Sequence, residues 1–278
     1  MKRNLSGMTV IITGASAGIG RALAQQLSAA GANLALAARR EDRLNQLNGQ
    51  LGGRHLVVAT DVSDPAQCGR LIGRTGDHFG RIDTLVCNAG YGLPRPVAQM
   101  GREEFDAIFR TNLFGTIDCI REAVLIMSRQ GLRDGYRGQI VIVSSAAARR
   151  GLPWFGAYSA TKAAQLSIAE ALRVELRPLK IAVTSIHPIG TDTDFFTTAQ
   201  QLSGATIPPR SAVEAHQSAG TVARAIVQGI RRPKPEVWPM GIVRILVAFG
   251  ILMPRLTDWI MSMHRRALGE ANRKNLSP

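Results

Sequence analysis

Short apolar runs alternate with longer amphipathic segments along most of the chain, and this alternation limits the fold more than any other feature. Six runs are apolar almost throughout: residues 8–13, 33–38, 55–60, 83–87, 139–144 and 180–187. Strands of a parallel sheet covered on both faces have this composition, whereas a strand with one face in water alternates apolar and polar residues. Intervening segments such as GRALAQQLSAAG have the helical period. The sequence therefore predicts a doubly wound α/β fold, with helices on both faces of a parallel sheet.

The pattern changes after Pro235. We expect one α/β domain over residues 1–235 and an apolar, basic, helical extension over residues 236–278. The run GIVRILVAFGILM (241–253) is apolar except for Arg244 and two glycines. Residues 231–278 contain nine basic and three acidic residues.

The apolar run of the extension is shorter than the roughly 20 residues that a spanning helix needs. Three interpretations remain open. The extension lies on an anionic membrane surface, with Trp259 and the methionines inserted; it packs on its own chain or on a second subunit; or it forms a short, tilted span. The first predicts a peripheral membrane association.

The net charge and the cysteine content limit the possible binding partners and the cellular compartment. The formal net charge of +14 suits acidic surfaces, phosphates or anionic lipid, although scattered arginines can also reflect a general composition bias. The three cysteines are far apart and the five histidines are dispersed, so we expect no metal site and a reducing, cytoplasmic location. The N-terminal apolar run leads straight into a glycine-rich turn, which indicates a strand and not a targeting segment.

That glycine-rich turn, TGASAGIG (13–20), follows the first predicted strand and opens the first predicted helix. Gly14 permits a tight turn, and Gly18 and Gly20 let a diphosphate approach the backbone. The helix N-terminus adds unpaired N–H groups and a positive dipole end. The spacing differs from G-x-G-x-x-G, but its place between a strand and a helix favours a dinucleotide-binding turn.

The end of the second predicted strand distinguishes the two nicotinamide dinucleotides. An acidic residue here accepts a hydrogen bond from the 2′-hydroxyl of NAD, whereas a cation pairs with the 2′-phosphate of NADP. The sequence has Ala38, Arg39 and Arg40 at this place. Arg39 is placed to pair with phosphate, so we expect NADP(H). The alternative is that both arginines are solvated charges at a helix start.

Residues 158–162 read YSATK, in which one of three tyrosines precedes a lysine by four positions. Residues i and i+4 share a helix face, so Lys162 should lie beside Tyr158. Two unit charges about 5 Å apart at an effective dielectric of about 20 interact by roughly 3 kcal/mol, or about two pKa units. We therefore expect Lys162 to favour the phenolate and bring Tyr158 within range for proton transfer.

These motifs and four others together resemble the short-chain dehydrogenase/reductase (SDR) family over about residues 8–197, in the family's order. The matching elements are TGASAGIG, Asp61 in TDVSD, CNAG (87–90), Asn112 in TNLFG, Ser145 thirteen residues before Tyr158, YSATK, and HPIGTDTDF. Two positions depart from the family pattern. Cys87 stands where Asn is usual, and Ile189 stands where Gly is usual.

The resemblance implies a Rossmann fold and an enzyme that transfers hydride between a nicotinamide and a carbonyl or alcohol carbon. It implies that Ser145, with Ser144 as its rival, polarises the substrate oxygen, and that Tyr158 exchanges the proton. Asn112 would anchor a water that relays protons from Lys162 to solvent. The cofactor-binding residues that follow are Gly14, Ser16, Gly18, Ile19, Gly20, Arg39, Asp61, Val62, Asn88, Ala89, Gly90, Tyr158, Lys162, Pro188 and Thr193.

The segment after Thr193 is expected on the substrate side, because ligands of such folds bind beyond the carboxyl ends of the strands. Residues 194–215 are polar with Gly and Pro, which is typical of a mobile lid or of a plain surface connection. We expect Trp154, Phe195 and Phe196 to line the substrate site. Such a lining favours a lipophilic ketone, aldehyde or alcohol.

Other functions remain as alternatives. A 3-oxoacyl-type reductase of the same family would carry the same motifs, and a non-catalytic NADP-binding regulator would keep the fold. No nucleic-acid partner is expected, since the chain has no recognisable binding module, lysine cluster or aromatic stacking set. The resemblance also implies a homodimer or homotetramer, formed through helices expected over residues 103–130 and 156–178.

Overall fold

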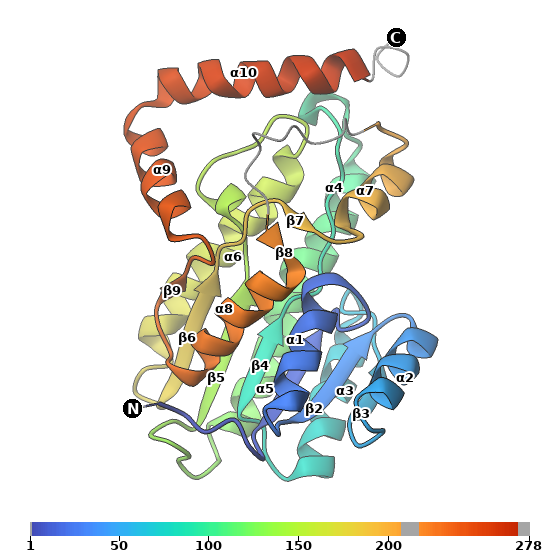
Figure 1. The fold of residues 1–278 in the computed structure, drawn as a ribbon, viewed down its shortest axis with the longest axis vertical. Helices are drawn as coiled ribbons and strands as arrows, with labels where there is room; N and C mark the ends of the chain where they lie inside the picture. The colour runs from blue at the N-terminus through green and yellow to red at the C-terminus, as the bar shows by residue number, and fades with distance from the viewer. Residues whose placement is uncertain (1, 207–216, 272–278) are drawn as a thin grey trace.

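A computed structural model describes residues 2–206 and 217–271 of the chain. Seven parallel strands form its main sheet, in the order β3-β2-β1-β4-β5-β6-β9 (Figure 1). They are β1 (Thr9–Thr13), β2 (Asn33–Ala38), β3 (Leu56–Ala59), β4 (Thr84–Cys87), β5 (Gly138–Val143), β6 (Ile181–Ile186) and β9 (Glu236–Val237). The predicted doubly wound α/β fold is confirmed, because the order reverses between β1 and β4 and every pairing in this sheet is parallel.

Helices cover both faces of the sheet. On one face α1, α2 and α8 pack on a core that includes Val10 and Ile12. On the other, α3, α5 and α6 pack on a core that includes Ile11, because successive strand residues point to opposite faces. The helices are α1 (Gly18–Ala29), α2 (Glu41–Gln50), α3 (Pro65–Phe79), α4 (Arg102–Phe109), α5 (Gly115–Met127), α6 (Gly156–Glu175), α7 (Phe195–Ser203), α8 (Ala219–Arg231), α9 (Gly241–Leu252) and α10 (Pro254–Ala271).

All six strands expected from the apolar runs are present, and the sheet also contains β9, which the sequence analysis did not identify. This strand has two residues, so it is too short to form an apolar run. It is held to β6 by backbone bonds from Ser185 N to Pro235 O (3.1 Å) and from His187 N to Val237 O (2.9 Å). The sheet therefore extends past the domain boundary expected at residue 235.

A buried carboxylate joins several segments at the amino end of the sheet. Asp83 is 1% exposed and accepts hydrogen bonds from Thr9 N (2.9 Å), Arg133 Nη1 (3.1 Å) and Arg81 Nε (2.8 Å). Two of the three donors are cationic, so this buried charge is paired as well as hydrogen-bonded. Because β1 and β4 are adjacent, this contact fixes the start of both strands.

The N-terminal segment closes the same end. The guanidinium of Arg3 is buried, and it donates to Gln139 Oε1 (2.6 Å) and to Asp83 O (3.2 Å). Arg3 N donates to Arg231 O at 2.8 Å. Burial lowers the pKa of Arg3, and the charge of Asp83 opposes that effect.

The C-terminal helices α9 and α10 form the expected helical extension. They lie at the carboxyl end of the sheet, where α10 runs along the top of Figure 1. An ion pair between Arg150 and Asp258 connects α10 to the loop that follows β5. Large apolar side chains on this helix pair are exposed to solvent; they are Ile242, Ile245, Leu246, Phe249, Ile251, Leu252, Met253, Leu256, Trp259, Ile260 and Met263.

Among the described residues, no single helix has the length and hydropathy to cross a membrane. Residues 241–252 and 254–263 meet that criterion only when taken together, with a bend of 112° between them.

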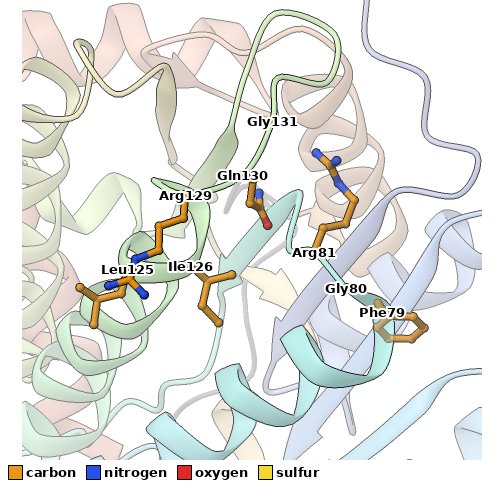
Figure 2. Close-up of a pocket in the computed structure, with 8 residues that line it drawn as sticks. All are labelled: Phe79, Gly80, Arg81, Leu125, Ile126, Arg129, Gln130 and Gly131. Atoms are coloured by element: carbon orange, nitrogen blue, oxygen red, sulfur yellow. The ribbon is translucent and has the colours of Figure 1, made fainter.

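A surface hollow of about 470 Å³ lies at the amino end of the sheet, between residues 79–81 and residues 125–131. Figure 2 shows Arg81, Gln130 and Arg129 around it. It lies away from the carboxyl ends of the strands, and none of the predicted site residues lines it.

Candidate active site

The carboxyl ends of six neighbouring strands bring the predicted residues to one edge of the sheet. The glycine-rich turn follows β1, Arg39 follows β2, Asp61 follows β3, Asn88 follows β4, Ser145 follows β5 and Pro188 follows β6. The strand order reverses between β1 and β4, and doubly wound folds bind their ligands at such a reversal. Residues dispersed over 175 positions of sequence therefore form one candidate site.

The turn after β1 has the backbone that an anion-binding turn needs. Gly14 and Gly18 have φ values of +69° and +51°, which favour glycine. A Cβ on Gly20 would collide with the carbonyl oxygen of Gly14. The first helix begins at Gly18 with no side chain capping it, so its first N–H groups face the turn without a side-chain partner. These features fit a dinucleotide diphosphate.

Asn88 holds this turn in place. Its Nδ2 donates to Thr13 O (2.9 Å) and Gly14 O (3.3 Å), and Thr13 Oγ1 accepts from the N–H groups of Asn88 and Ala89 (3.0 Å each). The predicted residues of β1 and β4 are thus linked directly. The Asn88 side chain is engaged with the turn, so its role toward a cofactor is one of support.

Two further predicted residues meet the turn. A Cβ on Gly18 would lie 2.9 Å from Cγ2 of Thr193, so Thr193 covers the turn from the substrate side. Ser16 Oγ accepts a hydrogen bond from Arg40 Nη2 at 3.3 Å. Of the two arginines after β2, Arg39 was the one expected to pair with phosphate. Both side chains are exposed, and Arg40 is the one that contacts the turn.

The third strand supplies Asp61 and Val62. Asp61 Oδ1 accepts hydrogen bonds from Ser63 N (2.9 Å) and Ser63 Oγ (2.8 Å), which fix the carboxylate at the strand end. Val62 is buried, and its carbonyl oxygen approaches Gly115 so closely that a Cβ there would collide with it. Gly115 therefore allows α5 to pack beside this part of the cofactor edge.

Ser145 and Tyr158 meet at the end of β5. Ser145 Oγ donates to Pro188 O at 3.4 Å, and its hydroxyl lies close enough to Tyr158 to act against the rise in the pKa of the phenol. The rival Ser144 is buried and donates to Lys162 O at 2.9 Å, so it supports α6 and does not reach the same point. The two hydroxyls of Ser145 and Tyr158 can therefore converge on one substrate oxygen.

Lys162 lies beside Tyr158, as the i, i+4 spacing predicts, with its Nζ 5.6 Å from the centre of the phenol ring. The expected lowering of the Tyr158 pKa is absent in the protein without ligands. Burial raises the pKa of Tyr158 to about 12, against the opposing hydrogen bond from Ser145. Burial also lowers the pKa of Lys162 to about 8. The expectation from the i, i+4 spacing included the attraction between the two charges but not the cost of removing them from water.

Asn112 lies in a π-helical turn, Arg110–Phe114, between α4 and α5. Its amide is paired with the backbone of Tyr91 in both directions, through Nδ2 to Tyr91 O (2.9 Å) and from Tyr91 N to Oδ1 (3.0 Å). Its backbone carbonyl oxygen accepts from Gln165 Nε2 (2.5 Å) and Thr116 Oγ1 (2.8 Å). Both lone pairs of this backbone carbonyl are thus used by donors within the protein. Nothing in the sequence analysis identified Gln165.

Aromatic side chains surround the exposed side of Tyr158. The ring of Phe195 lies 5.3 Å from that of Tyr158, and Phe155 lies 6.4 Å from both Tyr158 and Phe196. Trp154 is packed in the same cluster with φ of +68°. The predicted lining residues therefore gather at the site. The first part of the predicted lid forms α7, and residues 207–215 lie outside the described residues.

Within the described part of the chain, no group of three or more His, Cys, Asp or Glu residues could hold a metal ion. Cys68, Cys87 and Cys119 are buried free thiols.

The chain matches the family model for short chain dehydrogenases over residues 8–203. A curated relative, 11-beta-hydroxysteroid dehydrogenase 1A of Arabidopsis thaliana, is 32% identical over 274 residues, covering 92% of this chain and 75% of the relative. The fold and the site define an oxidoreductase that uses a nicotinamide dinucleotide. The protein belongs to the short-chain dehydrogenase/reductase family.

Two solved structures resemble the chain at the level of the whole fold. One is the 3-ketoacyl-(acyl-carrier-protein) reductase from Brucella melitensis complexed with NADH, with a TM-score of 0.72 and 28% identity, covering 82% of this chain and 92% of that one. The other is an alcohol dehydrogenase from the archaeon Thermococcus sibiricus complexed with 5-hydroxy-NADP, also with a TM-score of 0.72 and with 26% identity, covering 83% and 95%. The two structures are complexes with different dinucleotides, so they leave the choice between NAD(H) and NADP(H) open.

Proposed function

We propose that the protein interconverts a lipophilic ketone or aldehyde and its alcohol, with NADP(H) as the hydride carrier. One observation supports this most: Ser145, Tyr158 and Lys162 gather at the same carboxyl edge of the sheet as the glycine-rich turn, where the start of α1 has no side-chain cap. When bound, the cofactor supplies the hydride to the carbonyl carbon or accepts it from the alcohol.

Tyr158, Ser145 and Lys162 carry out the proton transfer that accompanies hydride transfer. In the direction of reduction, the neutral phenol of Tyr158 donates a proton to the substrate oxygen, and the hydroxyl of Ser145 donates a hydrogen bond that polarises it. The ammonium of Lys162 stabilises the phenolate that remains. In oxidation the phenolate takes the alcohol proton. The aromatic cluster of Phe155, Phe195 and Phe196 excludes water and favours an apolar substrate.

The activity is tested with a panel of ketones and aldehydes, by following loss of NADPH or NADH absorbance in parallel. We expect turnover of apolar carbonyl compounds with NADPH. A protein that binds NADPH and turns over no carbonyl compound would instead be the non-catalytic regulator. A 3-oxoacyl thioester belongs in the panel, because the Brucella melitensis relative is a 3-ketoacyl reductase.

The NADP(H) preference rests on the two exposed arginines after β2. Replacing Arg40 by Ala should weaken NADPH binding by about tenfold or more, because a charge-assisted hydrogen bond to phosphate is worth roughly 1.5–3 kcal/mol. Arg39→Ala should act in the same direction, and the double variant should lose most of the preference. NADH binding, measured by the same fluorescence titration, serves as the control. Equal weakening of both cofactors would contradict a 2′-phosphate site.

We also propose that α9 and α10 dock on an anionic membrane surface. The exposed apolar side chains of this pair are accompanied by exposed Arg244, Arg255 and Arg266, while Asp258 is paired with Arg150. A basic, apolar helical surface matches anionic headgroups over an acyl layer. Two copies meeting through this surface would bring like charges together. The homodimer or homotetramer expected through residues 103–130 and 156–178 is a separate proposal.

If α9 and α10 dock on a membrane, a charge introduced on their apolar surface should weaken binding to vesicles, which is measured by sedimentation. The variant Ile245→Glu should bind phosphatidylglycerol vesicles about tenfold or more weakly than the unchanged protein, because an exposed apolar anchor becomes an anion. Val174→Glu, at an equally exposed valine on α6, should bind as the unchanged protein does. Vesicle binding unaffected by Ile245→Glu would overturn the proposal. A dimer dissociated by that change would assign the surface to a second copy.

A further inference from the structure

A cluster of buried hydrogen bonds surrounds the ammonium of Lys162. Lys162 Nζ donates to Val143 O at 2.8 Å and to Gln165 Oε1 at 3.0 Å. Gln165 is 1% exposed, and its Nε2 donates to Asn112 O (2.5 Å) and Thr116 Oγ1 (2.9 Å). The side-chain amide of Gln165 therefore has a partner for its oxygen and for both of its N–H groups.

This cluster connects two elements that the sequence does not place together. Asn112 and Thr116 belong to the π-helical turn and the start of α5, whereas Gln165 and Lys162 lie one turn apart on α6. Thr116 Oγ1 also donates to Asn112 O, so that backbone carbonyl accepts two hydrogen bonds within the cluster.

We infer that Gln165 is a positioning residue, because its side-chain amide is held by Asn112 and Thr116 and its oxygen accepts a hydrogen bond from the ammonium of Lys162. The catalytic part of this inference rests on the proposed function.

Few other groups can govern the charge of Lys162. Among the described residues, the titratable groups that face it are Tyr158 on its own helix and Cys87 at the end of β4. Burial raises the pKa of the Cys87 thiol, which therefore stays neutral, and burial lowers the pKa of Lys162 to about 8. The oxygen of Gln165 is thus a neighbouring acceptor whose removal bears directly on the ammonium.

The test titrates Lys162 by NMR in protein with isotope-labelled lysine, which needs no substrate. The chain has five lysines, and the Lys162 signal is assigned by its loss in Lys162→Met. Gln165→Met keeps the length of the side chain and removes the acceptor, so the pKa of Lys162 should fall by about one to two pH units. Gln165→Glu should raise it, because a carboxylate favours the ammonium.

The matched control is Gln139→Met, which removes an equally buried glutamine at the other end of the sheet. Both glutamine-to-methionine variants should lose stability, but Gln139→Met should leave the titration of Lys162 unchanged. Gln165→Met and Gln165→Glu variants that both titrate as the unchanged protein does would overturn the inference.

In kinetics, Gln165→Met should raise the apparent pKa of alcohol oxidation, a value independent of how much protein is active. A shifted NMR titration in a protein without turnover would retain the positioning role and reject only the proposed function.

Discussion

Replacing Tyr158 by Phe should lower kcat for carbonyl reduction by about 10²–10⁴-fold, the usual contribution of a positioned proton donor. The ring contacts with Phe155 and Phe195 do not need the hydroxyl, so the aromatic cluster should keep its packing. The hydroxyl is the group that reaches Ser145 and the substrate oxygen. We therefore expect the NADPH dissociation constant to change by less than about threefold, since a neutral hydrogen bond contributes about 0.5–1.5 kcal/mol.

Turnover and cofactor binding are measured on the same preparation. Tyr136→Phe is the matched control, because Tyr136 lies near Arg3 at the amino end of the sheet, away from the site. It should keep full activity. Turnover retained in Tyr158→Phe would reject the phenol as the proton donor, whereas loss of NADPH binding would show that the change had damaged the cofactor site.

Replacing Asp83 by Ala should destabilise the protein by about 3–5 kcal/mol, as expected when one partner of a buried ion pair is removed. The variant leaves Arg81 and Arg133 without their carboxylate and Thr9 N without an acceptor. Total stabilities of domains are about 5–15 kcal/mol, so this loss is a large fraction. The free energy of unfolding is measured by urea denaturation with circular dichroism.

Asp106→Ala is the comparison for this second prediction. Asp106 pairs with Arg102 on the surface of α4, where both side chains are exposed. Such pairs contribute about 0–1 kcal/mol, so this variant should unfold close to the unchanged protein. If both variants lost a similar free energy of unfolding, the buried ion pairs of Asp83 would stabilise the protein no more than a surface pair does. Neither position contacts the candidate site.

The strands and the cofactor turn were predictable because their signals are local. Each strand from β1 to β6 is long enough to form an apolar run, and the turn at Gly14–Gly20 lies wholly between one strand and one helix. The order of the catalytic residues was available only through the family resemblance. The strand β9 was not predictable, since two residues give no pattern and their pairing depends on β6.

The details of the site depend on contacts between distant segments. Gln165 shares the face of Lys162 at i+3, which was a usable signal, but its bond to Asn112 crosses 53 positions of sequence. The role of Arg40 depends on Ser16, 24 positions away. The pKa values of Tyr158 and Lys162 depend on burial, which charge spacing along a helix does not report.

The contact of Arg3 with the far end of the domain bears on the order of assembly during synthesis. Its side chain reaches Gln139, 136 positions later, and its backbone reaches Arg231 at the end of α8. A chain emerging from the ribosome has its first residues ready long before these partners exist. Closing such long loops is entropically costly and slows folding. The N-terminal segment therefore docks late, only after nearly the whole sheet has been translated.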